Sequence, residues 1–298
     1  MSEQQIPQTG KTDPYGIATV QLETLENFSP SETSSASRYR FTFMNDLHLD
    51  ALLVNRKSDT LVVSLHGALD RKRYRLPRFE RLASIDQFSV SALYISDPSL
   101  WVDDELTLAW YAGWPGMDLY PRLATLINDT AKAIDAKNIV LTGSSGGGFA
   151  SLQISALIDK SLAIVFNPQT SIYAYEHPKW PHMPQRWLLR KIWNNLPGID
   201  PEKFDFSYDW TEQLGDRLSA VRRYMLPRKN YVYYLNNTQD THHLDKHFSP
   251  LAKVLRHVNS DHFRVENYVG GEGHRPPSPY EFHSGLTSAA SWRGFSLS

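Results

Sequence analysis

Near its middle the chain reads Ile139-Val140-Leu141-Thr142-Gly143-Ser144-Ser145-Gly146-Gly147-Gly148-Phe149-Ala150. This stretch opens with a β-branched apolar run, which is typical of a buried strand. After the glycines, residues 149–157 have the spacing of a helix. We therefore predict a strand, a tight turn and a helix, with the pattern Gly-x-Ser-x-Gly at the turn.

Such a turn holds its central serine in a strained backbone conformation with the hydroxyl exposed, an arrangement known as the nucleophile elbow. Very small neighbours are needed because the strand and the helix approach each other closely. Ser145 has Gly143 two positions before it and Gly147 two positions after it, whereas Ser144 lacks the first of these glycines. We predict Ser145 as a nucleophile and the backbone N–H of Gly146 as an oxyanion donor.

The glycines allow two other interpretations. One is a glycine-rich turn without chemistry, and the other is a phosphate-binding loop. A Walker loop needs Gly-Lys-Ser/Thr, and no lysine follows here. A dinucleotide-binding loop has a different glycine spacing.

Composition limits the class of protein. The 298 residues allow one large α/β domain or two small ones. The 31 basic and 32 acidic residues nearly cancel, which argues against a nucleic-acid binder. There is no cysteine, so a disulfide, a thiolate metal site and a cysteine nucleophile are excluded. Residues 1–11 are polar and no run of about 18 apolar residues exists, so we expect a cytoplasmic protein without a membrane span.

The beginning of the chain differs from the rest. Residues 1–37 are rich in Ser, Thr, Glu, Gln and Pro, and we predict an irregular N-terminal extension there. Residues 38–44 alternate as a half-buried strand does, and residues 50–55 are expected to pair with them.

A continuous apolar strand at residues 61–65 ends in His66-Gly67-Ala68. In hydrolases with a nucleophile elbow, the loop after such an early strand supplies the second N–H of the oxyanion hole. We therefore predict Gly67 and Ala68 as oxyanion-hole residues: Gly67 lets the backbone come close, and Ala68 or Leu69 offers the N–H. An ordinary turn at a strand end is the alternative.

A basic run follows at residues 71–81, with six basic residues against one acid. A solvated surface is the ordinary explanation of such a run. The functional alternative is a site for an anionic part of the substrate, with Arg71, Arg73 or Arg75 as the binding residue.

Strands and helices then alternate along the chain, which predicts a mostly parallel sheet flanked by helices. Further strands are predicted at residues 88–95, 161–167, 231–235 and 263–269, and helices at 106–111, 120–136, around 251–258 and after Pro279.

Residues 168–227 break this alternation, because they are rich in aromatic residues and interrupted by prolines. The segment is too long for a simple connection. We interpret it as an inserted cap over the active site, with Trp180 and Trp187 as candidate substrate-binding residues. The core of an extra subdomain is the alternative.

Ser145, Asp240 and His274 each follow directly after a predicted strand. Parallel strands bring such residues to one edge of the sheet, where ligands bind. A serine hydroxyl becomes a good nucleophile when a neutral imidazole takes its proton, and a carboxylate fixes the tautomer of that imidazole. We therefore predict a catalytic triad of Ser145, His274 and Asp240.

Other polar residues near Asp240 offer alternatives. His242, His243 and His247 could form a metal site with Asp240 and Asp245. Adjacent side chains diverge on a helix, so we favour a polar helix start and expect neither a metal nor a cofactor. Asp245 is the rival acid, but it is expected inside the helix rather than at the strand end.

With these motifs, the chain from about residue 38 to 298 resembles the α/β-hydrolase superfamily. The resemblance depends on Gly143–Gly147, His66-Gly67, Asp240 and Gly273-His274, in the order Ser, Asp, His that the fold uses. It implies one α/β-hydrolase domain with a cap insertion at about 168–227. The run at residues 237–243, Asn-Thr-Gln-Asp-Thr-His-His, is also loosely similar to proteins of bacterial capsular polysaccharide synthesis.

The superfamily hosts many activities, so the fold alone does not give a substrate. Three hypotheses stay open. The first is a serine esterase that acts on a polar small-molecule or glycan ester, and the second is a serine O-acyltransferase that modifies a surface glycan. The third is a non-catalytic binding protein on the same scaffold. The oligomeric state is not predicted.

Overall fold

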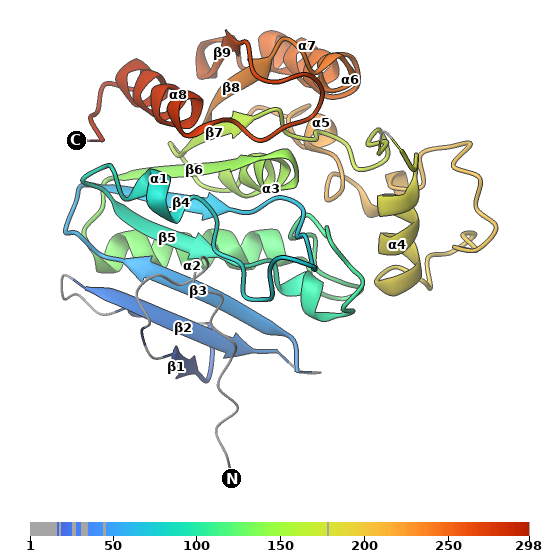
Figure 1. Cartoon of the computed structure of the whole chain (residues 1–298), viewed down its shortest axis with the longest axis horizontal. Helices are drawn as coiled ribbons and strands as arrows, with labels where there is room; N and C mark the ends of the chain where they lie inside the picture. The colour runs from blue at the N-terminus through green and yellow to red at the C-terminus, as the bar shows by residue number, and fades with distance from the viewer. Residues whose placement is uncertain are drawn as a thin grey trace.

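The structure is a computed structural model that describes residues 17, 19–25, 28–30, 35–43, 46–177 and 179–297. A single sheet of nine strands runs through the described part of the chain, in the order β1-β2-β3-β5-β4-β6-β7-β8-β9 (Figure 1). The strands are β1 Thr19–Leu22, β2 Ala36–Thr42, β3 His48–Val54, β4 Thr60–Leu65, β5 Ser91–Ile95, β6 Asn138–Ser144, β7 Leu162–Phe166, β8 Tyr231–Asn237 and β9 Phe263–Tyr268.

Six of these strands, β5, β4, β6, β7, β8 and β9, form one continuous parallel block. β3 is antiparallel to both of its neighbours, β2 and β5, and β1 is parallel to β2 at the edge. The central strands β4, β5 and β7 are buried along their whole length. Their apolar runs are therefore those of parallel strands covered on both faces, and the predicted mostly parallel sheet is confirmed.

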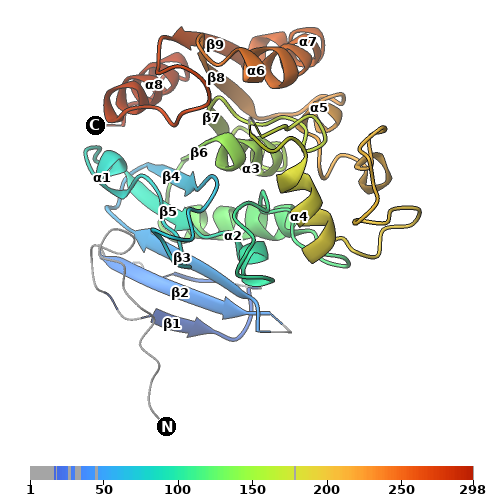
Figure 2. The same ribbon diagram turned by 45° about the vertical axis from the view of Figure 1, so that its right-hand side comes forward.

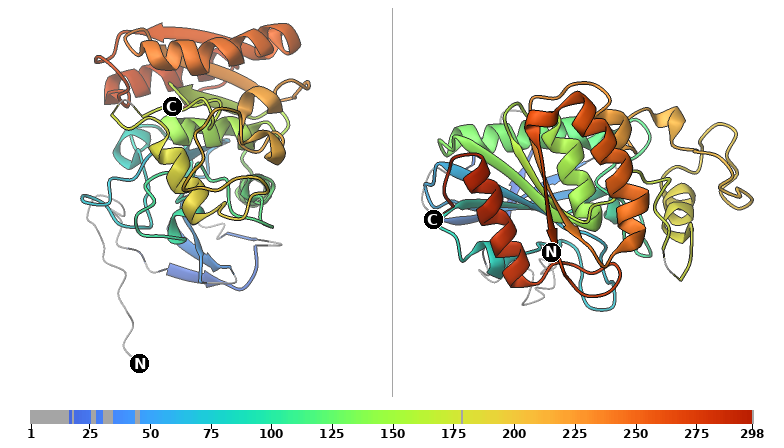
Figure 3. Two further views of the ribbon diagram at one scale, coloured as in Figure 1. Left: turned by 90° about the vertical axis from the view of Figure 1, so that its right-hand side faces the viewer. Right: turned by 90° about the horizontal axis from the view of Figure 1, so that it is seen from above.

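Helices cover both faces of the sheet. The helices are α1 Leu82–Ile85, α2 Leu119–Ala133, α3 Ser145–Ser155, α4 Met183–Lys191, α5 Ala220–Arg223, α6 Thr241–His243, α7 Ser249–Val258 and α8 Pro279–Trp292. One hydrophobic core lies between the sheet and α2, α3 and α7, and a second lies between the sheet and α1 and α8. Seen from above, α7 and α8 lie on opposite sides of β8 and β9 (Figure 3).

Strand β8 shows how the sequence produces these two layers. Val232 and Tyr234 belong to the core under α7, while Tyr233 and Leu235 belong to the core under α8. This alternation is the period of two that a strand imposes on its side chains. α8 begins with a capping box, in which Ser278 and Glu281 bond to each other's backbone N–H.

The segment between β7 and β8 contains α4, the short helix η2 (Glu212–Leu214) and α5. Figure 2 shows α4 and the loops after it beside the end of the sheet, outside the helical layers. Its aromatic residues are partly its own core, because Trp193, Phe204, Phe206 and Trp210 are all buried. Tyr175 and Glu176, at the start of the segment, line a cavity together with Asp240 and His274.

Two sequence predictions about local structure are wrong. The extension of residues 1–37 is not irregular throughout, because Thr19–Leu22 pair with β2 as an edge strand and β2 itself starts at Ala36. Most of the extension, including residues 1–16, lies outside the described residues. No helix forms at 106–111, because Trp110 and Tyr111 have positive φ angles of 54° and 58°. Tertiary bonds hold them, with Tyr111 N–H donating to Asp97.

Within the residues that the structure describes, no helix combines the length and the apolar composition that crossing a membrane requires.

Candidate active site

The glycine-rich stretch forms the elbow that its sequence predicts. β6 ends at Ser144, and α3 starts at Ser145, whose φ of +55° lies in the left-handed region that side chains rarely adopt. A Cβ atom on Gly147 would lie 2.1 Å from the carbonyl oxygen of Leu65, and one on Gly143 would lie 2.4 Å from the carbonyl carbon of Gly147. Only glycine therefore permits this approach of helix and strands. Ser144 has ordinary extended backbone, so Ser145 occupies the strained central position.

Asp240 and His274 meet at the same edge of the sheet. Asp240 follows β8, and His274 lies in the loop after β9. The two side chains are joined by a hydrogen bond of 2.8 Å between His274 Nδ1 and Asp240 Oδ2. Asp240 is 2% exposed, while the His274 side chain is 23% exposed. The carboxylate is therefore buried behind an imidazole that solvent can reach.

Asn167, directly after β7, fixes the position of Asp240. Its Nδ2 donates to Asp240 Oδ2 at 3.0 Å, and its Oδ1 accepts from the backbone N–H of Asn237 at 2.6 Å. Burial alone would raise the pKa of Asp240, but hydrogen bonds from His243, His274 and Asn167 outweigh it and hold that pKa well below its usual range. Asp240 is thus a carboxylate near neutral pH.

A second histidine shares this carboxylate. His243 Nδ1 lies 3.1 Å from Asp240 Oδ1, and the His243 ring stacks on the His274 ring at 3.8 Å with an angle of 5° between the planes. Burial lowers the pKa of His243 to about 4, with the neighbouring histidines adding to the effect. His243 is therefore neutral near pH 7.

The hydroxyl of Ser145 contacts Gln169, which lies shortly after β7. Gln169 Nε2 donates to Ser145 Oγ at 2.8 Å, and the Gln169 side chain is completely buried. Within the described residues, Ser145 Oγ has this hydrogen bond to Gln169 and has none to His274. The structure thus brings Asp240 and His274 into direct contact and places Ser145 beside them through Gln169 and His243.

The loop after β4 lies against the elbow, because a Cβ atom on Gly67 would lie 3.2 Å from the carbonyl oxygen of Ser144. The N–H of Leu69, one of the two predicted donors, bonds to the carbonyl of Thr107 at 2.6 Å, and the N–H of Gly67 bonds to Glu80 Oε2 at 3.2 Å. The next residue, Ala68, is exposed, and it remains the predicted second donor. Gly146 lies in the first turn of α3, where N–H groups have no acceptor within the helix.

Arg71 has a structural role, and its docking of a substrate anion stays a prediction. Its Nε donates to the carbonyl of Leu106 at 2.9 Å, and its Nη2 donates to the carbonyls of Leu100 and Asp103. Arg73 and Arg75 are exposed, so a contact of these two with a substrate anion stays a prediction.

We expect Arg71→Met to lower the free energy of unfolding by about 1–3 kcal/mol, because partly buried carbonyls lose a charged donor. Arg73→Met is the matched control, since Arg73 is exposed; its change should stay within about 0.5 kcal/mol. Urea unfolding of both variants measures the difference. Equal, small losses would show that the bonds of Arg71 do not stabilise the loop.

The two tryptophans predicted to bind substrate lie apart from the cavity beside His274. Trp180 is 61% exposed and stacks on His177. Trp187 is half-buried, with Arg190 and Lys191 over its ring. Their role in binding substrate stays a prediction.

The cavity beside His274 has a volume of about 190 Å³. Most of its lining residues have polar side chains, and they are Tyr175, Glu176, Gln239, Asp240, Thr241, His242, His243, Glu272, Gly273 and His274.

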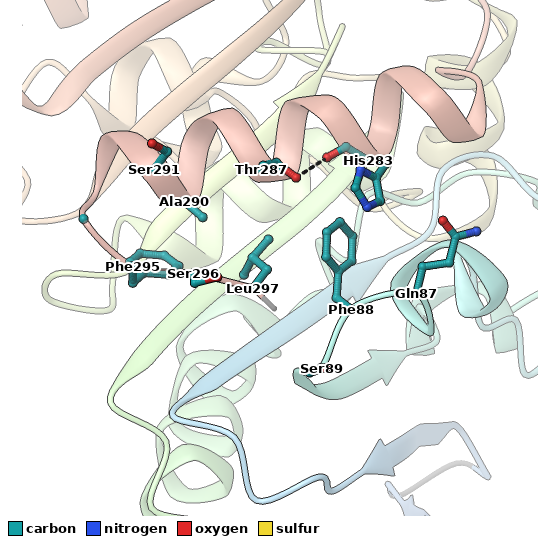
Figure 4. A pocket seen from close by; sticks show the side chains of 11 residues that line it. Gln87, Phe88, Ser89, His283, Thr287, Ala290, Ser291, Phe295, Ser296 and Leu297 are labelled. Atoms are coloured by element: carbon teal, nitrogen blue, oxygen red, sulfur yellow. Dashed lines mark hydrogen bonds between the residues drawn. The ribbon is translucent and has the colours of Figure 1, made fainter.

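A larger cavity of about 530 Å³ lies elsewhere, between α8 and the loop before β5. Figure 4 shows Phe88 facing His283 across it, with Leu297 beside them, and the two rings stack at 4.4 Å. Phe88 precedes β5, so this cavity lies at the amino end of the strands, opposite the elbow. It contains none of the predicted site residues.

One group of side chains has the geometry of a metal site. Among the described residues, the ligand atoms of Asp240, His243 and His274 lie within 4.8 Å of one another. Both imidazoles turn Nδ1 to the carboxylate of Asp240, however, and such contacts need a proton between the partners. These bonds explain the cluster without an ion.

We therefore expect ester hydrolysis to survive dialysis against EDTA, since the serine mechanism needs no Lewis acid. The rate before and after dialysis is the measurement, with buffer-dialysed protein as control. Loss of the rate that zinc or manganese restores would contradict the serine mechanism.

Three residues of the site were missed from the sequence: Asn167, Gln169 and His243. Asn167 and Gln169 directly follow β7, so polar residues after a buried strand were the available signal. His243 was weighed only as a metal ligand or helix start. Its spacing of three from Asp240 places both on one face of a helical turn, which was the missed signal.

No protein-family model matches the sequence, and a comparison with curated proteins finds no similar one. Solved structures do match. Prolyl oligopeptidase B from Galerina marginata has 12% identity and a TM-score of 0.55 over 89% of this chain, which spans 38% of that protein. Dipeptidyl peptidase 4 from Porphyromonas gingivalis has 12% identity and a TM-score of 0.54 over 87% of this chain, which spans 35% of it.

A third solved structure is matched by this chain over nearly the whole length of the solved protein. The capsule O-acetyltransferase of Neisseria meningitidis serogroup A in complex with CoA has 10% identity and a TM-score of 0.53, covering 85% of this chain and 92% of that one. The resemblance to capsule-associated proteins is thus confirmed at the level of the fold. The chain has the α/β-hydrolase fold.

Proposed function

We propose that this chain is a serine hydrolase that works through an acyl-enzyme on Ser145 and acts on a polar or carbohydrate-linked ester. The observation that carries the proposal is the hydrogen bond of 2.8 Å between His274 and buried Asp240, beside a serine held at a φ of +55°. A strained serine and an oriented histidine are what acyl transfer requires.

The residues have separate roles in this proposal. Ser145 Oγ attacks the carbonyl carbon of the ester while His274 Nε2 takes its proton. Asp240 holds the imidazole through Nδ1 and stabilises the imidazolium that forms. The N–H groups of Gly146 and Ala68 stabilise the negative oxygen. His274 then gives the proton to the departing alcohol, and a water molecule hydrolyses the acyl-enzyme by the same steps.

The cavity beside His274 supports a polar, uncharged substrate. Gln239 and Thr241 offer hydrogen-bonding groups, while Glu176 and Glu272 add negative charge. Neither lysine nor arginine is among the residues that line it. Hydroxyl groups of a sugar suit such walls, and an anionic group in the cavity would be repelled.

A serine O-acyltransferase is the second candidate. It is favoured by the match to a capsule O-acetyltransferase, because that match covers 92% of the other chain. Both activities share the acyl-enzyme and differ only in whether water or a sugar hydroxyl accepts the acyl group. A non-catalytic binding protein is disfavoured because the Asp240–His274 bond and the strained Ser145 occur together at one edge of the sheet.

The test has two steps. Intact mass spectrometry after treatment with a fluorophosphonate probe should show one covalent adduct. p-Nitrophenyl acetate is then offered with and without a neutral monosaccharide. If the acetyl group is recovered only as acetate, the protein is a hydrolase. If it is recovered on the sugar, the protein is a transferase. The proposal would be overturned if the probe formed no adduct and the protein released no nitrophenol.

A further inference from the structure

Gln169 lies where three other side chains meet, those of Trp110, Ser145 and His243. Its Oε1 accepts from the indole Nε1 of Trp110 at 3.2 Å. Its Nε2 lies 2.8 Å from Ser145 Oγ and 3.2 Å from His243 Nε2. Its backbone N–H also donates to the carbonyl of Ser145 at 3.3 Å. The Gln169 side chain is therefore fixed at both ends.

The indole settles which way the amide faces. An indole N–H can only donate a hydrogen bond, so Trp110 must face the carbonyl oxygen of the amide. The NH₂ group then faces Ser145 and His243, with one proton available for each. Trp110 is completely buried, so water does not compete for its N–H.

The first amide proton determines what the Ser145 hydroxyl can do. Because Gln169 Nε2 can only donate, Ser145 Oγ accepts that bond with a lone pair. The hydroxyl proton is then directed elsewhere and is available to a base. A donor on Oγ also stabilises the negative charge that grows there as the proton leaves.

The second amide proton determines what His243 can do. His243 Nε2 accepts this proton, so its own proton lies on Nδ1 and is donated to Asp240 Oδ1. With Nε2 occupied, His243 cannot take the proton of Ser145. His274 is different, because its Nδ1 bonds to Asp240 and no partner is recorded for its Nε2 within the described part of the chain.

We infer that Gln169 is a further catalytic residue, which donates to Ser145 Oγ and at the same time occupies His243, so that His274 alone serves as the base. This inference rests on the proposed function. In acylation the Gln169 bond stabilises the Oγ anion as the C–O bond forms. In deacylation it stabilises the same oxygen as that bond breaks and the proton returns from His274.

The first test reads the protonation of His243 directly. With ¹⁵N-labelled histidine at pH 7, the His243 ring should show the neutral form that carries its proton on Nδ1, with the signal assigned by its loss in His243→Gln. Finding the proton on Nε2, or a charged ring, in the native protein would overturn the inference. This measurement needs no variant of Gln169 and no activity.

The second test removes the donor. Gln169→Glu keeps the shape but faces Ser145 and His243 with a carboxylate, so His243 should become charged. We expect the rate of fluorophosphonate labelling and kcat to fall by about tenfold to a hundredfold, the usual effect of losing a hydrogen bond to a charged group. KM should change little, since Gln169 touches the reacting oxygen rather than a binding wall.

Gln153→Glu is the matched control. Gln153 is also completely buried, and its Nε2 donates to two carbonyls away from the site, those of Asp216 and Arg217. This variant should keep the native labelling rate and the native His243 signal. Equal losses in both variants would indicate a structural role only and contradict the inference. Failure of the native protein to be labelled would instead contradict the proposed function.

Discussion

Ser145→Ala is expected to abolish labelling by a fluorophosphonate and to reduce ester turnover to background, the largest effect of any single change in this chain. The reason is geometric as well as chemical, since Ser145 alone combines the start of α3, a φ of +55° and a donor on its hydroxyl. Losing a triad nucleophile typically removes about 10⁶ in kcat. Intact mass and nitrophenol release measure it, and circular dichroism should show the native fold.

Ser144→Ala is the control for this prediction. Ser144 is the adjacent serine, but its φ of −111° places it in ordinary extended backbone at the end of β6. This variant should keep both the adduct and the turnover. If Ser144→Ala lost the adduct and Ser145→Ala kept it, the nucleophile would be the other serine.

The elbow could be predicted from sequence because its constraint is local. Strand, glycines and helix are contiguous, and the collision of a Cβ at Gly143 or Gly147 with neighbouring backbone limits both positions to glycine. Asp240 and His274 could be predicted because a parallel sheet brings its strand ends to one edge. Their contact at 2.8 Å follows from that topology.

The parts that sequence did not reveal depend on long-range hydrogen bonds. Arg71 and Leu106 are 35 residues apart, so nothing local marks the guanidinium as an anchor for carbonyls. Leu69 lies far along the chain from Thr107, whose carbonyl takes an N–H that was offered as an oxyanion donor. Gln169 is 59 residues from Trp110, whose indole orients it. A polar residue at a strand end can be located from sequence, but its partner cannot.

The shared carboxylate is the clearest case of this limit. The three histidines after Asp240 suggested a metal site or a polar helix start. The helix start is confirmed, because α6 begins at Thr241 with Asp240 as its N-cap, and the structure also buries His243 against Asp240 and stacks it on His274. Which histidine can act as base then depends on whether its Nε2 already has a hydrogen-bond partner. Tertiary structure alone determines that partner.

Asp240→Asn is expected to reduce kcat by about 10³-fold or more, as the loss of the acid does in other triads. The carboxylate accepts from His274, His243 and Asn167, and an amide in its place must turn NH₂ toward one of these donors. His274 would then lose the partner that fixes its tautomer. His274→Asn should be at least as damaging, because it removes the base itself.

Asp245→Asn tests the choice of acid with the same chemical change. Asp245 is exposed in the helical turn Leu244–Phe248, and its carboxylate is not among the recorded partners of His274 within the described residues. The kcat of Asp245→Asn on p-nitrophenyl acetate should therefore match that of the native protein.

His243→Gln separates the two imidazoles, because it removes the ring stacked on His274 but leaves the His274–Asp240 bond in place. It should retain much more activity than His274→Asn. A crippled Asp245→Asn would assign the acid to Asp245, and a His243→Gln variant as inactive as His274→Asn would remove the distinction between the two histidines.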